Sequence, residues 1–353
     1  GGDYSAQNCA DGTTSADILK VGTLLPTTGT LAFLGPPEIA GVGLAVDDIV
    51  AGGDKACTFW TDSGDSNDMT VSSASADELI NAKVSIVIGA ASSSVSLNVV
   101  DKLTKSASPI VQISPANTAA SLSGYSPFYF RTAPPDTVQG SALGQLITSD
   151  GNANIAFLVF NDAYGTGLRD VIEQTVTGAG GAVTYGAKGA GQEFPPGQTT
   201  FSSEVTAALA TNPDAIVIIA FDETKAIIPE LVSQGWDMSR TYYTDGNTSD
   251  FSKDFEPGTL EGAQGTIPGA NPAEDFKEKA SAWHKSVEGS ALDDYSYSAE
   301  SYDAVILSAL AALKGGATDP ATIQANLAAV SGATGGEECS TYADCKELIA
   351  GGK

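Results

Sequence analysis

The feature of this sequence that most limits its fold is a repeated alternation of short β-branched runs with longer segments of helical period. The first run spans residues 20–25, and the helical pattern that follows is opened by Pro36 and Pro37 and closed by Gly52 and Gly53. The pattern recurs about every 25 to 30 residues, which is typical of βα units and not of solenoid repeats. It predicts an α/β fold with mainly parallel sheets flanked by helices.

Two series of these units follow one another along the chain. The first series ends with a strand at 109–114, and the second begins after Arg131 and ends with a strand at 241–244. A chain of 353 residues is long enough for each series to bury its own core. We therefore expect two lobes of similar architecture.

The final third of the chain has more helices than strands to support them. Helical patterns lie at 272–287, 298–313 and 320–329, with few strand-like residues between them. Helices of this kind need a sheet to cover, and the first lobe has faces to spare. The chain is expected to cross back to the first lobe near Gly265.

The charge balance limits the partners. The sequence has 43 Asp plus Glu against 17 Lys plus Arg, for a formal net charge of -26. Such a chain repels nucleic acid and anionic lipid at long range, so the partners should be small molecules or proteins. The acidity also fits a surface that is simply solubilising. No run approaches the roughly 20 apolar residues that a membrane helix needs.

Four cysteines indicate an oxidising compartment. They are Cys9, Cys57, Cys339 and Cys345, and the last two enclose a short loop. We favour the disulfides Cys9 to Cys57 and Cys339 to Cys345. A structural zinc is disfavoured, because neither pair has the Cys-x-x-Cys spacing and the chain has one histidine.

Motifs for catalysis or nucleotide binding are missing from the sequence. Ser92 to Ser94 follow a strand and open a helix, but the Gly-x-Ser-x-Gly elbow is absent. His284 lies beside Trp283 in an amphipathic pattern without a visible serine partner, and is expected at the surface. No phosphate-binding glycine motif occurs. We expect no enzyme activity, no cofactor and no metal.

Three unusually polar loops follow predicted strands, where open parallel sheets bind ligands. The loop at 90–94 combines small residues with serines and suits a carboxylate, although the serines could simply cap a helix. The loop at 114–118 offers the hydroxyl of Thr118 and backbone donors. In the loop at 244–247, Asp245 could meet an ammonium group or could cap a helix.

The start of the chain, residues 1–17, is polar and is typical of the tether that follows a cleaved export signal. A lipidated cysteine just before Gly1 would fit this start. The expected location is extracytoplasmic, in the periplasm or lipid-anchored at the cell surface.

Six segments together carry a family resemblance: residues 25–29, 41–48, 87–89, 113–115, 130–140 and 162–167. The most specific is Phe-Arg-Thr-Ala-Pro-Pro-Asp-Thr-Val-Gln-Gly at 130–140. From about Lys20 to Leu313 the chain resembles the Leu/Ile/Val-type, or branched-chain amino-acid type, periplasmic binding proteins of ABC transporters.

This resemblance implies the two-lobed type I periplasmic-binding-protein fold, with a three-crossing hinge and closure of the cleft around a ligand. After the tether, lobe 1 would comprise 18–135 plus 268–335, and lobe 2 would comprise 136–267 plus 336–353. Relatives with a similar cysteine loop usually continue into a last strand pair of the second lobe, so a tail is expected to be missing after Lys353. The function implied is extracytoplasmic solute binding for an ABC importer, by a monomer whose partners are an amino-acid-like ligand and a membrane permease.

The resemblance also assigns ligand-binding residues. Ser93 and Thr118 would hold a carboxylate, Asp245 would hold the α-ammonium, and Tyr164 is the tyrosine before Gly-x-Gly. The other expected lining residues are Ala91, Ala116, Leu34 and Phe221, the last two replacing aromatic residues of the branched-chain binders. Trp60 could approach the cleft or be a core aromatic.

Because Leu34 and Phe221 differ from the residues of the branched-chain binders, the resemblance does not define which ligand side chain is bound. The alternatives to an amino-acid binder are a sensory ligand-binding domain of the same fold and a binder of an amide or aromatic carboxylate.

Overall fold

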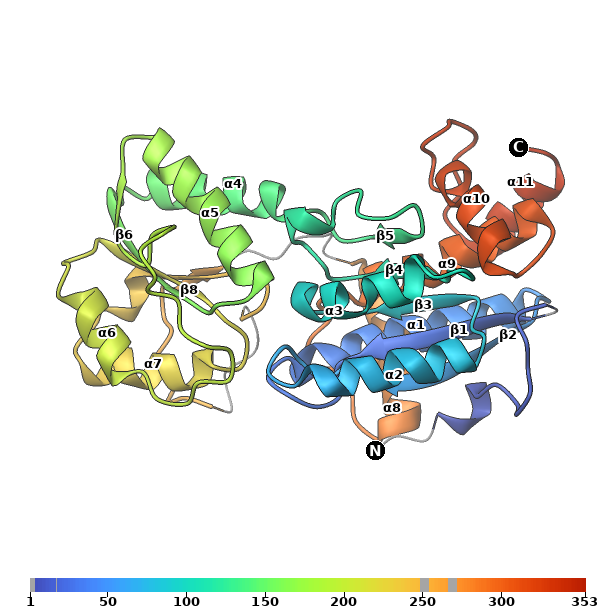
Figure 1. The fold of residues 1–353 in the computed structure, drawn as a ribbon, viewed down its shortest axis with the longest axis horizontal. Helices are drawn as coiled ribbons and strands as arrows, with labels where there is room; N and C mark the ends of the chain where they lie inside the picture. Colours follow the sequence, from blue (N-terminus) through green and yellow to red (C-terminus); the bar gives the residue numbers. More distant parts are fainter. Residues whose placement is uncertain (1–3, 17, 248–253, 266–271) are drawn as a thin grey trace. The chain divides into compact units, whose positions relative to one another are not determined.

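The computed structural model describes residues 4–16, 18–247, 254–265 and 272–353 (Figure 1). The chain forms two compact units. The first unit comprises Gly1–Asn117, Gly124–Ala133 and Gly269–Lys353, and the second comprises Thr118–Ser123 and Pro134–Pro268. The expectation of two α/β units built on parallel sheets is confirmed.

The first unit is built on a five-stranded parallel sheet of order β2-β1-β3-β4-β5. Its strands are β1 (Leu19–Leu25), β2 (Ala56–Asp62), β3 (Ile86–Gly89), β4 (Val111–Ser114) and β5 (Tyr129–Arg131). The short strand β5 lies just before the point where we expected the second series to begin.

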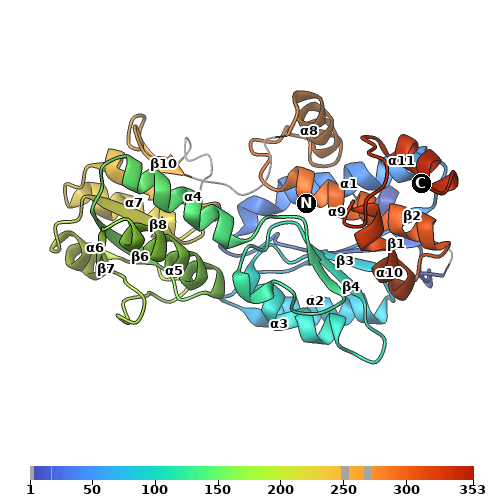
Figure 2. The same ribbon diagram turned by 90° about the horizontal axis from the view of Figure 1, so that it is seen from above.

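Helices cover both faces of this sheet. Figure 2 shows α2 (Met69–Asn81) and α3 (Ser93–Thr104) on one side and α1 (Gly35–Ala51) and α9 (Ser298–Gly315) on the other. Side chains of successive strand residues point to opposite faces. Leu24 therefore packs with the α2 and α3 cluster, whereas Leu25 packs with the α1 and α9 cluster.

The returning chain adds α8 (Glu274–Glu288) and α10 (Pro320–Val330) to the α1 and α9 side of the first unit. This confirms that the late helices cover the first sheet. The strand β10 (Gln264–Gly265) still pairs with the second sheet, and the crossing itself falls within 266–271, outside the described residues.

The end of the chain differs from expectation. Helix α11 (Tyr342–Ala350) packs on α9, and Tyr342 and Cys345 are buried in the core of the first unit. Lys346 Nζ also lies 2.9 Å from a carboxylate oxygen of Asp54. Residues 336–353 therefore belong to the first unit and not, as expected, to the second.

The second unit is built on a parallel sheet of order β10-β9-β8-β6-β7. Its other strands are β6 (Asn154–Val159), β7 (Ala182–Tyr185), β8 (Ala215–Ile219) and β9 (Thr241–Tyr243). Within this unit, Figure 1 shows α4 (Asp136–Ser149) and α5 (Ala163–Gly178) on one side of the sheet, and α6 (Ser202–Leu209) and α7 (Thr224–Ser233) on the other.

The described part of the N-terminal segment is anchored to the first unit. The ring of Tyr4 lies 4.9 Å from Trp60 and 5.9 Å from Trp283, and Gln7 donates a hydrogen bond of 2.8 Å to the carbonyl of Gly43. The residues around Tyr4 and Gln7 are thus docked, whereas residues 1–3 and 17 of the expected tether lie outside the described residues.

Both predicted disulfides are confirmed. Cys9 is bonded to Cys57 and Cys339 to Cys345, with S–S distances of 2.01 and 2.03 Å. The first ties the N-terminal segment to β2, and the second closes the loop at the start of α11. Across the described ranges, no helix combines the length and the apolar character needed to cross a membrane.

Candidate ligand-binding residues

The candidate residues of the first unit follow three adjacent strands of its sheet. Leu34 comes after β1, Ala91 and Ser93 come after β3, and Ala116 comes after β4. All four residues are buried. Because carboxyl ends of neighbouring parallel strands share one edge of a sheet, the fold gathers these residues at the edge where such sheets bind ligands.

The turn after β3 depends on a glycine. Gly89 has a φ of +138°, and a Cβ there would lie 1.9 Å from the carbonyl oxygen of Leu24. Only glycine, which has no Cβ, allows the backbone at position 89 to lie this close to β1.

The cap of α3 separates two neighbouring serines. The hydroxyl of Ser92 accepts a hydrogen bond of 3.4 Å from the amide of Val95 and caps the helix, whereas Ser93 is the first helical residue. Ser93 therefore stands at a helix N-terminus, where amide groups and the helix dipole favour an anion. The capping role that we weighed for the serines falls to Ser92.

Neutral amides hold the loop after β3 in place. Asn117 donates hydrogen bonds of 2.9 and 3.0 Å to the carbonyls of Ala90 and Ala91, and Gln112 donates one of 3.0 Å to the carbonyl of Gly89. Neither amide was predicted from the sequence to support the site. The available signals were a polar residue within β4, Gln112, and another in the loop that follows, Asn117.

The second loop of the first unit is less open to a ligand than expected. The amide of Ala116 donates to the hydroxyl of Ser114 across 3.3 Å. Thr118, expected in the first lobe, groups with the second unit, where its carbonyl accepts a 2.6 Å hydrogen bond from the amide of Asp136. Thr118 is thereby fixed to the first turn of α4.

The candidate residues of the second unit also follow adjacent strands. Tyr164 comes after β6, Phe221 after β8 and Asp245 after β9, and these strands are neighbours in the sheet. The structure brings all three side chains together. The ring of Phe221 lies 5.4 Å from that of Tyr164, and the Tyr164 hydroxyl donates a 2.5 Å hydrogen bond to Asp245 Oδ1.

Tyr164 is the centre of this group. Its hydroxyl oxygen lies 2.7 Å from the Thr244 hydroxyl and accepts a hydrogen bond of 3.1 Å from the amide of Gly246. Burial, and then the negative charges of Asp245 and Asp136, raise the pKa of Tyr164 well above its ordinary value. The phenol therefore keeps its proton and can donate to Asp245.

The carboxylate of Asp245 is fixed by two donors. Besides Tyr164, Gln139 Nε2 donates a hydrogen bond of 2.9 Å to Asp245 Oδ1. Residues 248–253 lie outside the described residues, so the alternative that Asp245 caps a helix is not tested. The acid is buried at the sheet edge, where a cationic ligand group would be stabilised.

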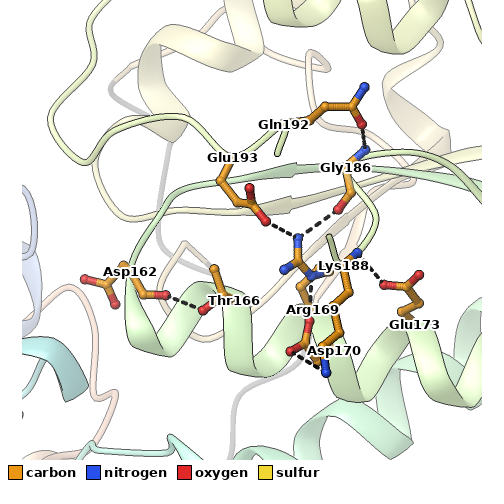
Figure 3. Close-up of polar contacts among 9 residues, drawn as sticks. All are labelled: Asp162, Thr166, Arg169, Asp170, Glu173, Gly186, Lys188, Gln192 and Glu193. Atoms are coloured by element: carbon orange, nitrogen blue, oxygen red, sulfur yellow. Dashed lines mark hydrogen bonds and ion pairs between the residues drawn. The ribbon is translucent and has the colours of Figure 1, made fainter. Parts of the chain in front are cut away.

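Helix α5, which carries Tyr164, is anchored by a buried arginine (Figure 3). Arg169 pairs with Asp170 at 2.7 Å and with Glu193 at 2.8 Å, and donates a 2.9 Å hydrogen bond to the carbonyl of Gly186. These bonds tie the helix to the loop after β7. At its N-terminus, Asp162 caps the helix by accepting a 2.9 Å hydrogen bond from the Tyr164 amide.

The first unit also contains a buried acid that has two further acids near it. Glu38, on α1, is completely buried, and neither of its carboxyl oxygens has a hydrogen-bond partner among the described residues. Burial first, and then Glu300 and Asp294, raise the pKa of Glu38 well above its usual range. The environment thus favours the protonated, neutral acid.

Two residues that the sequence singled out, His284 and Trp60, lie in the first unit. His284 is buried, contrary to the expected surface position, because its Nδ1 lies 2.6 Å from the carbonyl of Ser290 and α8 packs on α1. Trp60 is partly buried and packs against Tyr4 and Trp283 beside the core of the first unit. Within the described ranges, no group of three potential metal ligands was found.

Comparison with known proteins supports the same fold. A search of curated proteins found no match. Among solved structures, the leucine-binding protein LivK of Thermotoga maritima is 22% identical, with a TM-score of 0.76 over 88% of this chain and 87% of that one.

Two further structures, each with its ligand, are similar. A solute-binding protein from R. palustris, in complex with 4-hydroxybenzoate, is 18% identical over 88% of this chain and 84% of that one, with a TM-score of 0.72. The branched-chain amino-acid transporter substrate-binding protein LivJ of Streptococcus pneumoniae, in complex with isoleucine, is 21% identical over 88% of each chain, with a TM-score of 0.71. At these identities the likeness establishes the fold.

A family model described as periplasmic binding protein matches residues 18–341. The resemblance stated from the sequence motifs is thereby confirmed, and the family and fold are those of solute-binding proteins and not of enzymes. The chain belongs to the periplasmic binding protein family.

Proposed function

We propose that the chain is the extracytoplasmic solute-binding protein of an ABC importer and that its ligand is a small zwitterion, an amino acid or a derivative. Ser93 and Thr118 would bind the carboxylate of this ligand, and Asp245 would bind its ammonium. The observation that carries the proposal is the carboxylate of Asp245, fixed by Tyr164 and Gln139 at the edge of the second sheet. A membrane permease would receive the ligand.

The first unit supplies what a carboxylate needs. Ser93 opens α3, so the first amides of the helix and the positive end of its dipole are close to the serine hydroxyl. The carbonyls of Ala90 and Ala91 are engaged by Asn117 and do not have to face an anion. Hydrogen bonds to a charged acceptor are worth about 1.5 to 3 kcal/mol each.

The second unit supplies what an ammonium needs. A buried carboxylate is costly unless a cation or strong donors compensate it. Tyr164 and Gln139 provide donors to Asp245 Oδ1 but no charge. A ligand ammonium would complete the compensation, which favours ligands with a cationic group over simple acids.

An aromatic carboxylate is the second candidate ligand. The Phe221 ring lies 4.8 Å from Phe160 at an interplanar angle of 81° and 5.4 Å from Tyr164, so aromatic faces adjoin Asp245. An aromatic group of a ligand would pack favourably there. Two of the similar structures hold 4-hydroxybenzoate and 3,4-dihydroxybenzoic acid.

A thermal-shift screen separates the two candidates. The purified chain is heated with each of the twenty amino acids, with 4-hydroxybenzoate and with simple amides. A ligand at 100 times its dissociation constant should stabilise the protein by about 2.7 kcal/mol. We expect at least one amino acid to raise the melting temperature. If only aromatic acids raise the melting temperature, the ligand is an aromatic carboxylate and not a zwitterion. If none of the compounds raises it, the proposed function is contradicted.

The location and the partner can be tested in the same system. Both disulfides fit an oxidising, extracytoplasmic compartment, as does the family. Uptake of the radiolabelled amino acid from the screen, measured in source cells with and without the gene for this chain, tests the importer role. Equal uptake in the two strains would argue against it.

A further inference from the structure

We propose that Gln139 is a positioning residue for ammonium recognition. It would hold Asp245 in the geometry that makes the protein prefer a ligand with an ammonium over the same ligand without one. The inference rests on the proposed function and adds a residue from helix α4 that does not itself have to touch the ligand.

The contact between Gln139 and residue 245 is double. Nε2 of Gln139 donates a 2.9 Å hydrogen bond to the carboxylate Oδ1 of Asp245, and Oε1 of Gln139 accepts a 3.1 Å hydrogen bond from the amide of Asp245. One side chain therefore fixes both the backbone and the carboxylate of the acid. Gln139 is 3% exposed and Asp245 is 5% exposed, so both bonds are shielded from water.

Only an uncharged amide meets both demands. The contact needs one donor and one acceptor at the end of a side chain of this length, and glutamine has both. A glutamate would lose the donor when ionised. An arginine or lysine could donate to Asp245 but would cancel its charge, and the ammonium of the ligand would then have no carboxylate to meet. Gln139 orders the acid and leaves its charge available.

The same helix turn adds negative charge. Asp136 is the first residue of α4, three positions before Gln139, and it is fully buried. The charges of Asp136 and Asp245 both act on the Tyr164 hydroxyl. Two acids thus lie around one phenol, with Gln139 bonded to one of them. This accumulation of negative charge strengthens the preference for a cationic ligand group.

The test compares Gln139→Met with Gln145→Met. Methionine has nearly the length of glutamine but makes neither hydrogen bond, and Gln145 is an exposed residue of the same helix. Titration calorimetry measures the affinity for the best amino acid of the screen and for its des-amino acid, beginning with L-leucine and 4-methylpentanoate. The same ligands are titrated into Asp245→Asn and into the double variant Gln139→Met/Asp245→Asn.

We expect Gln139→Met to weaken amino-acid binding by about tenfold and des-amino binding by less than about twofold, the scale of one bond to a charged group acting indirectly. Gln145→Met should change neither affinity. In the Asp245→Asn background, Gln139→Met should have no further effect on the preference for the ammonium.

Equal losses for the two ligands would make Gln139 a structural residue and overturn the inference while the proposed function stands. An unchanged affinity for both would overturn it as well. A wild-type protein that binds no amino acid would instead contradict the proposed function, and the inference would fall with it. A Gln139→Met protein that does not fold is replaced by Gln139→Asn, in which the shortened amide should lower the same ligand preference.

Discussion

The two units present opposite chemistry at equivalent places. In each, the candidate residues follow three adjacent parallel strands, but the first unit offers a helix N-terminus and a serine, whereas the second offers a buried carboxylate beside aromatic rings. The loop after β3 is held by the neutral amides of Asn117 and Gln112. Equivalent strand ends thus carry groups suited to an anion in the first unit and groups suited to a cation in the second.

Both units also contain a buried acid whose surroundings provide no positive charge that the described contacts show. In the second unit, Gln139 orders Asp245 without a positive charge. In the first unit, the one fully buried acid of α1, Glu38, is favoured in its neutral form. A buried charged group whose protein partners are neutral still needs an opposite charge, and a bound ligand could supply it.

The largest expected effect comes from removing the hydroxyls assigned to the carboxylate. In the double variant Ser93→Ala/Thr118→Ala, two hydrogen bonds to a charged group are lost, at a cost in binding free energy of about 3 to 6 kcal/mol. The amino acid and its des-amino acid should lose equally, because both have the carboxylate. Calorimetric titration measures both losses, and unchanged affinities would remove Ser93 and Thr118 from the site.

The second effect tests the cation-binding unit. Asp245→Asn keeps the shape of the side chain but removes its charge, and should cost about 2 to 5 kcal/mol of binding free energy for an amino acid. The des-amino acid should bind nearly as well as before. The ratio of the two dissociation constants reports the comparison directly, and a ratio like that of the wild type would show that Asp245 does not meet the ammonium.

A third variant tests how much the buried amide of Asn117 contributes to the stability of the first unit. Asn117 is fully buried, its Nδ2 donates to two carbonyls, and its Oδ1 accepts a 3.0 Å hydrogen bond from the Tyr129 hydroxyl. Asn117→Leu leaves these groups without their partner and should lower the free energy of unfolding by about 2 kcal/mol.

The matched control for this variant is Asn98→Leu, at an exposed asparagine whose amide donates to Ser72 and Ser73. Its expected cost is below about 0.5 kcal/mol. Urea unfolding compares the two variants with the wild type. Equal costs would show that the buried amide contributes no more than a surface one.

The strands and the strand-end loops could be predicted from the sequence because both signals are local. Apolar runs bounded by glycine and polar residues located β3 and β9, and the residues directly after them contain Ser93 and Asp245. The strands β5 and β10 were missed, and the two residues of β10 are too short to establish a period.

The partners of the site could not be predicted in the same way. Gln139 and Asp245 are 106 positions apart, and although Gln139 lies in the motif at 130–140, nothing in the local sequence indicates its contact with Asp245. The placement of α11 failed for a related reason. Tyr342 and Cys345 form an apolar face that would suit either unit, and the choice depends on tertiary contacts such as the ion pair of Lys346 with Asp54.

The smallest expected effect, taken per pH unit, concerns the pH dependence of the stability of the first unit. The pKa of Glu38 is raised well above its usual range in the folded protein, by burial and by Glu300 and Asp294. Above the ordinary pKa of a glutamate, the unfolded chain releases this proton while the folded chain retains it. The folded state then binds more protons than the unfolded state, so stability decreases as the pH rises, until the pKa of the folded state is passed. One such group can contribute a slope of at most about 1.4 kcal/mol per pH unit.

In Glu38→Gln the neutral amide has no proton to lose, so the variant should gain stability relative to the wild type between pH 5 and pH 8. Urea unfolding of both proteins at pH 5, 6, 7 and 8 measures the difference. Parallel curves would mean that the pKa of Glu38 is not raised in the folded protein, and the contrast between a neutral Glu38 in the first unit and the carboxylate of Asp245 in the second would then fail.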